Sequence, residues 1–187
     1  VGAAEAPRSG TGARGTVDAW FGVAPQRSAS RDVGFGVRQL SEIAARALSP
    51  VINDPYTALA CLDWMTDAFS LVVRRQPIAA LRSASDGTLR LMETPASFRT
   101  ISEAGLEPII AYGLDSAMVA LYTIRCLTRL GGLVVRPQDA ATLKHLVGRV
   151  LSQAQVRLRD AHSLAELLAL TQNINEHLDQ KFSLAPP

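Results

Sequence analysis

The stretch that decides the fold is GVRQLSEIAARALSPVINDP, residues 36–55. Its first part places apolar residues at intervals of three and four, which is the period of one helix face. This spacing predicts a helix over 36–48 whose apolar face consists of Val37, Leu40, Ile43, Ala44, Ala47 and Leu48. Arg38, Glu42 and Arg46 lie four residues apart, which is typical of a solvated helix face.

A corner follows this helix. Ser49-Pro50 and Asp54-Pro55 each join a small oxygen-bearing side chain, which accepts from free N–H groups, to a proline, which suits the first helical position. Two such helix starts five residues apart predict one tight turn and then a helix over 55–75. We expect its apolar residues to face inward and its carboxylates to face outward.

The next two helices are predicted from their caps and breakers. Ser97 should cap a helix over 97–112, and Pro108 inside it should bend or break it. Asp115 is a natural cap for a helix over 116–130. Gly131-Gly132 should end that helix, because glycine is the commonest helix stop.

Two longer amphipathic helices are expected over 137–158 and 163–182, and Asp86-Gly87 between two short apolar arms predicts a β-hairpin. The predicted fold is therefore mainly α, with about six helices in a bundle-like domain and one short β-hairpin. We expect 1–26 to be a flexible linker or a fragment of a preceding region, 27–182 a single helical domain, and 183–187 a tail.

The composition narrows the functional classes. The 187 residues are 48% hydrophobic and 19% charged, and the formal net charge of +2 comes without any basic block, so no nucleic-acid partner is predicted. The longest apolar run, over 106–124, contains Glu107, Pro108 and Asp115, so it does not predict a spanning helix. Cys61 and Cys126 fall in apolar helical patterns and are expected to be buried thiols.

The sequence predicts no catalytic residue, metal ligand or cofactor. Residues 10–15 match the glycine pattern of dinucleotide sites, but no buried strand precedes them and no helical period follows. His145, His162 and His177 lack ligand-like spacing. Asp63 and Asp67 lie one helical turn apart. We interpret them as part of an outward polar stripe, in preference to a carboxylate pair for acid–base chemistry or metal binding.

Polar residues are densest around the corner. If the two helices are antiparallel, these side chains meet near the edge of the core and must satisfy one another. One interpretation is a structural network, and the other is an anion, ligand or partner site at a helix start. The candidate binding residues are Arg31, Asp32, Arg38, Gln39, Glu42, Ser49, Asn53, Asp54 and Thr57.

The same residues carry a family resemblance. Residues 32–58 resemble the signature D-x-x-F-G-[IV]-R-Q-L-x-D-I-A-x-[RK]-A-L-S-P-x-I-N-D-P-x-T-A of a bacterial family described only as predicted membrane proteins of unknown function. Glu42 stands where that family usually has Asp. The resemblance extends more loosely to about residue 174. It implies transmembrane helices before this part of the protein, and it implies no reaction, cofactor or catalytic residue.

Three functional hypotheses follow. The leading one is a soluble helical domain tethered to the cell membrane of a bacterium through an N-terminal membrane region, expected on the cytoplasmic side, that acts in binding, regulation or assembly. The second is a ligand- or anion-sensing domain that gates a transmembrane pore, with Arg38 and residues 49–57 as receptor. The third is a metal-dependent hydrolase. Self-association through the last two helices is left open.

Overall fold

The computed structural model describes residues 32–76, 79–92 and 96–183. These residues form six helices and one two-stranded antiparallel sheet, which confirms the predicted mainly α fold with one hairpin. The predicted linker over 1–26, the candidate residue Arg31 and the tail residues 184–187 lie outside the described part. In chain order the elements are α2 Val33–Ala47, α3 Pro55–Arg74, β1 Leu81–Ser83, β2 Leu89–Met92, α4 Phe98–Tyr112, α5 Ala117–Leu133, α6 Pro137–Arg157 and α7 Ala161–Ser183.

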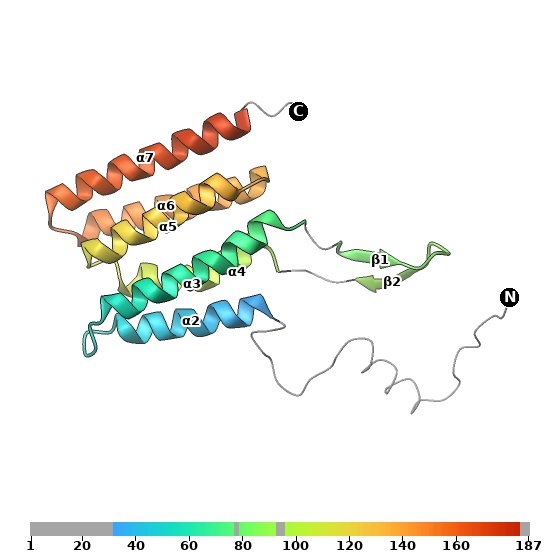
Figure 1. Ribbon diagram of the computed structural model, residues 1–187, viewed down its shortest axis with the longest axis horizontal. Coiled ribbons are helices and arrows are strands. Elements are labelled where there is room, and N and C mark those ends of the chain that lie inside the picture. Colours follow the sequence, from blue (N-terminus) through green and yellow to red (C-terminus); the bar gives the residue numbers. More distant parts are fainter. Residues whose placement is uncertain (1–31, 77–78, 93–95, 184–187) are drawn as a thin grey trace.

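The helices lie side by side with roughly aligned axes (Figure 1). α2 packs on α3 and α4, α3 packs on α5, and α6 packs on α4, α5 and α7. A continuous apolar core joins them, because each helix contributes one apolar stripe and no single helix can bury its own. The largest fully buried side chains include Leu62, Met65, Phe69, Ile109, Leu127, Leu143 and Leu167.

The corner between α2 and α3 has the predicted form. One turn closes on the carbonyl oxygen of Ser49, which accepts from the amides of Ile52 at 3.1 Å and Asn53 at 2.8 Å. Asp54 is the N-cap of α3, as predicted, and α3 then runs back along α2 (Figure 1). α2 itself begins three residues before the predicted start, because Asp32 caps it by accepting from the amide of Phe35 at 3.0 Å.

The predictions for the middle of the chain need three corrections. α4 is one helix from Phe98 to Tyr112, so Pro108 does not break it. The N-cap of α5 is Ser116 rather than Asp115, because a turn in which the Ser116 amide donates to the Gly113 carbonyl oxygen at 3.2 Å delays the helix by one residue.

The predicted stop at Gly131-Gly132 is also wrong, since α5 continues through both glycines to Leu133. α7 covers this end of α5, and Lys181 Nζ donates to the Gly132 carbonyl oxygen at 2.9 Å. A cation that binds the last carbonyl groups of a helix stabilises its final turn, so the tertiary contact overrides the glycine signal.

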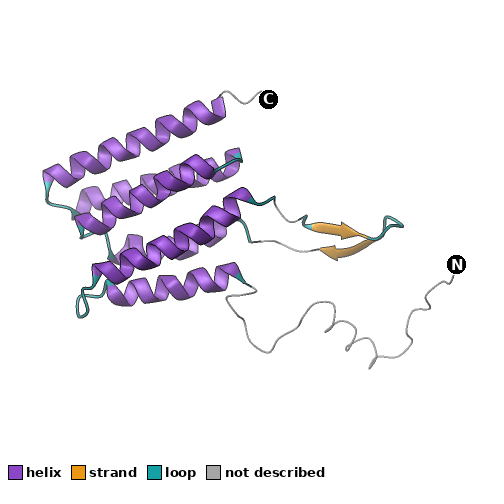
Figure 2. Cartoon of the chain, in the orientation of Figure 1, coloured by secondary structure: helices purple, strands orange, loops and turns teal. Residues whose placement is uncertain are grey.

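The hairpin stands apart from the helical layers (Figure 2). Its strands pair in the register Leu81 opposite Met92 and Arg82 opposite Leu91. Gly87 adopts a φ of 81°, a left-handed conformation that glycine reaches without a steric penalty and that the turn requires. The hairpin therefore forms where Asp86-Gly87 predicted it.

Across the described ranges, none of the helices is both long and apolar enough to cross a membrane.

Candidate functional site

The structure divides the predicted polar cluster into two groups. Arg38, Gln39 and Glu42 are exposed residues of α2, whereas Ser49, Asn53, Asp54 and Thr57 lie in the corner. Nine residues of helix separate Arg38 from the end of α2, which is ~14 Å at 1.5 Å per residue. Arg38 is exposed and has no ion pair within the described part of the chain.

The corner residues form a capping network. The Thr57 hydroxyl donates to Asp54 Oδ2 at 2.5 Å, and the Thr57 amide donates to Asp54 Oδ1 at 3.2 Å. The hydroxyl bond first, and the amide bond second, lower the pKa of Asp54 below its ordinary value. Asp54 and Thr57 therefore act on the start of α3, which agrees with the structural interpretation of these two residues.

A hollow of about 480 Å³ lies between this corner and the α4–α5 connection. Its polar lining includes Asn53, whose φ of 47° is in the left-handed region, together with Asp115 and Ser116. Ser116 makes no side-chain cap to α5, so its hydroxyl is not used at the helix start. The acidic and amide oxygens of this lining suit a neutral or cationic ligand better than an anion.

An apolar groove of about 480 Å³ lies between α2 and α3. Gln39 is the one polar side chain in a lining made of Val33, Gly36, Val37, Gln39, Leu40, Ile43, Trp64 and Ala68. Trp64 is 67% exposed and Ile43 is 47% exposed. Ile43 was expected on the core-facing stripe, and the structure instead leaves it on the rim of this groove. The apolar period of α2 thus continues beyond the part of the face that the core covers.

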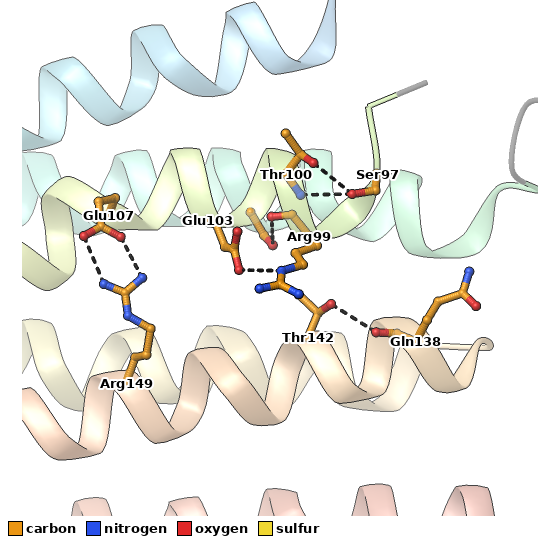
Figure 3. Close-up of polar contacts among 9 residues, drawn as sticks. Ser97, Arg99, Thr100, Glu103, Glu107, Gln138, Thr142 and Arg149 are labelled. Carbon is orange, nitrogen blue, oxygen red and sulfur yellow. Dashed lines mark hydrogen bonds and ion pairs between the residues drawn. The ribbon is translucent and has the colours of Figure 1, made fainter. Parts of the chain in front are cut away.

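A second polar surface, which the sequence did not predict, runs between α4 and α6 (Figure 3). Arg149 donates to both carboxylate oxygens of Glu107 at 2.7 and 2.9 Å, and this pairing lowers the pKa of Glu107. Arg99 Nε donates to Glu103 at 2.9 Å. Glu107 and Arg149 are 42 residues apart, so no local spacing could have indicated the pair.

The hollow beside these residues has a volume of about 580 Å³ and lies at the N-terminal ends of α4 and α6. His145 and Arg99 are its basic side chains, and the buried carboxylate of Asp139 also lines it. Asp139 is already paired with Arg136, whose Nη2 lies 2.5 Å from Asp139 Oδ2, and Arg99 is paired with Glu103. Both charges are therefore compensated within the protein.

The two carboxylates of α3, Asp63 and Asp67, both form an ion pair with one arginine. Arg129 of α5 lies 3.4 Å from Asp63 and 3.4 Å from Asp67, and the Tyr122 hydroxyl donates to Asp63 at 2.7 Å. This hydrogen bond to the carboxylate raises the pKa of Tyr122. Among the described residues no group of three or more His, Cys, Asp or Glu side chains is placed to hold a metal ion.

The cysteines have the environment that their apolar patterns predicted. Cys61 and Cys126 are buried free thiols, and burial raises the pKa of both. A raised pKa reduces the thiolate fraction, so neither cysteine has the character of a nucleophile.

Comparison with known proteins gives the chain a family. Rv1290c, an uncharacterized protein of Mycobacterium tuberculosis, is 28% identical over 162 residues, which are 87% of this chain and 31% of the relative. Mb1321c, an uncharacterized protein of Mycobacterium bovis, matches over the same shares. The chain thus spans 31% of the length of these curated relatives. No solved structure matches it.

Residues 4–129 match the family described as "Predicted membrane protein (DUF2254)". This match includes the corner, the groove helices α2 and α3, the hairpin, and most of α5. Since it covers more than half of the chain, the protein belongs to this family of predicted membrane proteins.

Proposed function

We propose that this chain is an assembly module of a bacterial membrane protein, and that the α2–α3 groove receives an apolar helix from the membrane-associated remainder of that protein. The observation that carries the proposal is the groove itself, whose lining has a single polar side chain and an indole that is 67% exposed. An exposed tryptophan beside other apolar side chains is typical of an interaction site.

The shape of the groove suits a helix. Two antiparallel helices form its walls, and the residues of α2 that line it extend from Val33 to Ile43, which is ~15 Å or about three helical turns. Recognition of this kind places apolar anchors at helical spacing into a groove between helices. A protein of the relatives' length leaves room for such a helix outside this chain, because this chain corresponds to 31% of their length.

Cysteine protection in the full-length protein tests the proposal. Ile43→Cys should react slowly with a maleimide in native membranes, because an occupied groove covers it. The two native thiols of this chain are buried and should add little labelling. Val156→Cys is the matched control, since Val156 is an apolar residue of α6 that is 84% exposed and outside the groove.

A second substitution distinguishes protection by a bound helix from low reactivity of position 43 itself. Trp64→Asp puts a charge into the groove, and it should release the bound helix and make Ile43→Cys react as fast as Val156→Cys. Equal and rapid labelling of both cysteines in the otherwise unaltered protein would rule out an occupied groove.

A ligand-sensing role is the second candidate, and the hollow at the corner supports it. Asn53 and Asp115 supply acceptor groups there, which favours a neutral or cationic ligand. A thermal-shift screen of cations, neutral metabolites and anions tests this role. Stabilisation by a cation or neutral compound that Asn53→Ala abolishes would support it, and an unchanged Tm throughout the screen would count against it.

A further inference from the structure

We propose that the β1–β2 hairpin is a membrane-contacting arm that binds the surface of an anionic lipid bilayer. The inference is independent of the α2–α3 groove, because it rests on a different element with a different charge. Its basis is the juxtaposition, on one short hairpin, of a bare apolar face and an excess of arginine.

The apolar face follows from the strand register. Leu81 lies opposite Met92 and Ser83 lies opposite Leu89, and Leu81 and Ser83 share a face because they are two residues apart on β1. The register shifts between Arg82 and Ser83, which adds one residue to β2 and lets Leu89 and Met92 share that face although they are three residues apart. Leu81, Leu89 and Met92 therefore point to the same side, and they are 58%, 51% and 77% exposed. A two-stranded hairpin is marginal in water on its own, so this face is suited to burial against something else.

The charge around the hairpin is mainly positive. Arg74 and Arg75 end α3, and Arg82 and Arg90 lie on the strands, against Asp86 in the turn and Glu93 directly after β2 in the sequence. Asp86 lies 3.6 Å from Arg90 and accepts from the Thr88 amide at 2.9 Å. Arg74, Arg75 and Arg82 form no ion pair within the described part of the chain.

This combination fits a lipid surface with phosphate headgroups. The arginine side chains can bind phosphate oxygens in pairs, while three adjacent apolar side chains enter the boundary between headgroups and acyl chains. Basic residues add to the attraction of an anionic bilayer for a neighbouring apolar element. An acidic protein surface would also complement the arginines. The exposed leucine and methionine side chains on one face of the hairpin, however, favour a partner with an apolar phase.

The position of the hairpin agrees with this partner. It leaves the bundle between α3 and α4 at the end where α2 begins, and it extends away from the helices (Figure 1). An arm so placed can touch a flat surface without the bundle itself being embedded. The family is described as predicted membrane proteins, which is consistent with a bilayer surface near this chain.

Vesicle co-sedimentation of the whole 187-residue chain tests the inference. Vesicles of phosphatidylcholine mixed with phosphatidylglycerol should bind the protein, vesicles of phosphatidylcholine alone should bind it far less, and added salt should weaken the binding. The double variant Arg82→Gln/Arg90→Gln and the triple variant Leu81→Ser/Leu89→Ser/Met92→Ser should each lower the binding by roughly tenfold or more.

The control variant is Val156→Ser/Arg159→Gln, which removes an exposed apolar residue and an exposed arginine near the opposite end of the bundle. It should bind vesicles as the unaltered chain does. All variants should keep the helical circular dichroism and the Tm of the unaltered chain, because the substituted side chains lie on the surface. The inference would be overturned if the unaltered chain bound anionic vesicles no more than background. It would also be overturned if the control variant lost as much binding as the hairpin variants.

Discussion

Ser41 of α2 donates its hydroxyl to the carbonyl oxygen of Ala104 in α4 at 3.4 Å. Ala104 stands four residues before Pro108, so its carbonyl group is the one that the missing proline N–H leaves without a helical partner. Ser41 is 2% exposed and has no access to water as an alternative partner. A polar residue within the apolar pattern of α2 thus compensates a proline within α4.

This relationship predicts a conditional effect of Ser41→Ala. In the unaltered protein the substitution removes the side-chain partner of the Ala104 carbonyl oxygen, and we expect a loss of about 0.5–1 kcal/mol in the free energy of unfolding, since the bond is long and part-buried. In a Pro108→Ala background the helix supplies its own N–H group, so the same substitution should cost less. Urea unfolding of the four proteins measures the coupling, and a cost that is identical in both backgrounds would contradict this assignment.

Gly105 predicts a second packing effect. A Cβ atom there would lie 2.6 Å from Val37 Cγ1 and 3.1 Å from Phe69 Cζ, because α4 approaches both α2 and α3 at this residue. We expect Gly105→Ala to destabilise the protein by about 1–3 kcal/mol. Gly148→Ala is the matched control in α6, where a Cβ atom meets nothing within 4 Å and the change should stabilise by up to about 1 kcal/mol. Thermal or urea unfolding compares the two, and equal effects would contradict the close approach.

Arg136 predicts a third effect, since it links α3 to α6. Its guanidinium donates to the carbonyl oxygen of Arg75 at 2.5 Å and to the buried carboxylate of Asp139 at 2.7 Å. Arg136→Met would leave that carboxylate unpaired, at a cost of about 3 kcal/mol. Adding Asp139→Leu should recover much of the loss, because no buried charge then remains. Urea unfolding of both variants provides the measurement, and a double variant that is less stable than the single one would contradict the pairing.

The cap of α3 predicts a pH dependence. The pKa of Asp54 is lower in the folded protein than in the unfolded chain, so its contribution to stability is present above the unfolded pKa and is lost as pH falls through the folded pKa. Asp54→Ala should therefore lower the Tm at neutral pH, and its difference from the unaltered protein should shrink in acid, below about pH 4.

A control variant isolates the charge in that experiment. Asp54→Asn keeps a side-chain oxygen that can accept from the Thr57 amide, so it should keep part of the cap without the pH dependence. Differential scanning calorimetry across the acid range measures the three proteins. A gap between the unaltered protein and Asp54→Ala that stays constant into strong acid would contradict the shifted pKa.

Local signals predicted most of the secondary structure. Asp54-Pro55, Ser97 and Asp86-Gly87 act within a few residues of themselves, and each lies where its cap or turn chemistry predicted. The two glycines at 131 and 132 were misleading because their effect is also local: each weakens the helix around itself. The helix continues because Lys181 of α7 binds its last carbonyl groups, and this contact is not visible in the local sequence.

The candidate site was less accessible to sequence reasoning. The polar residues of 31–57 are close in sequence, but a helix moves a residue 1.5 Å along its axis for each position, so Arg38 and Asn53 lie in different places. The groove was also missed, because a helical period shows which face is apolar and leaves open how much of that face a neighbour covers.

By itself the sequence determined where the chain turns, where most helices begin and which residues are apolar on each helix, since these depend on caps, prolines and spacing within one segment. Only the tertiary structure decided that α4 continues through Pro108, that Glu107 meets Arg149, and that Ile43 and Trp64 remain uncovered. These outcomes depend on which helix faces which, and that is set by burial of the whole core.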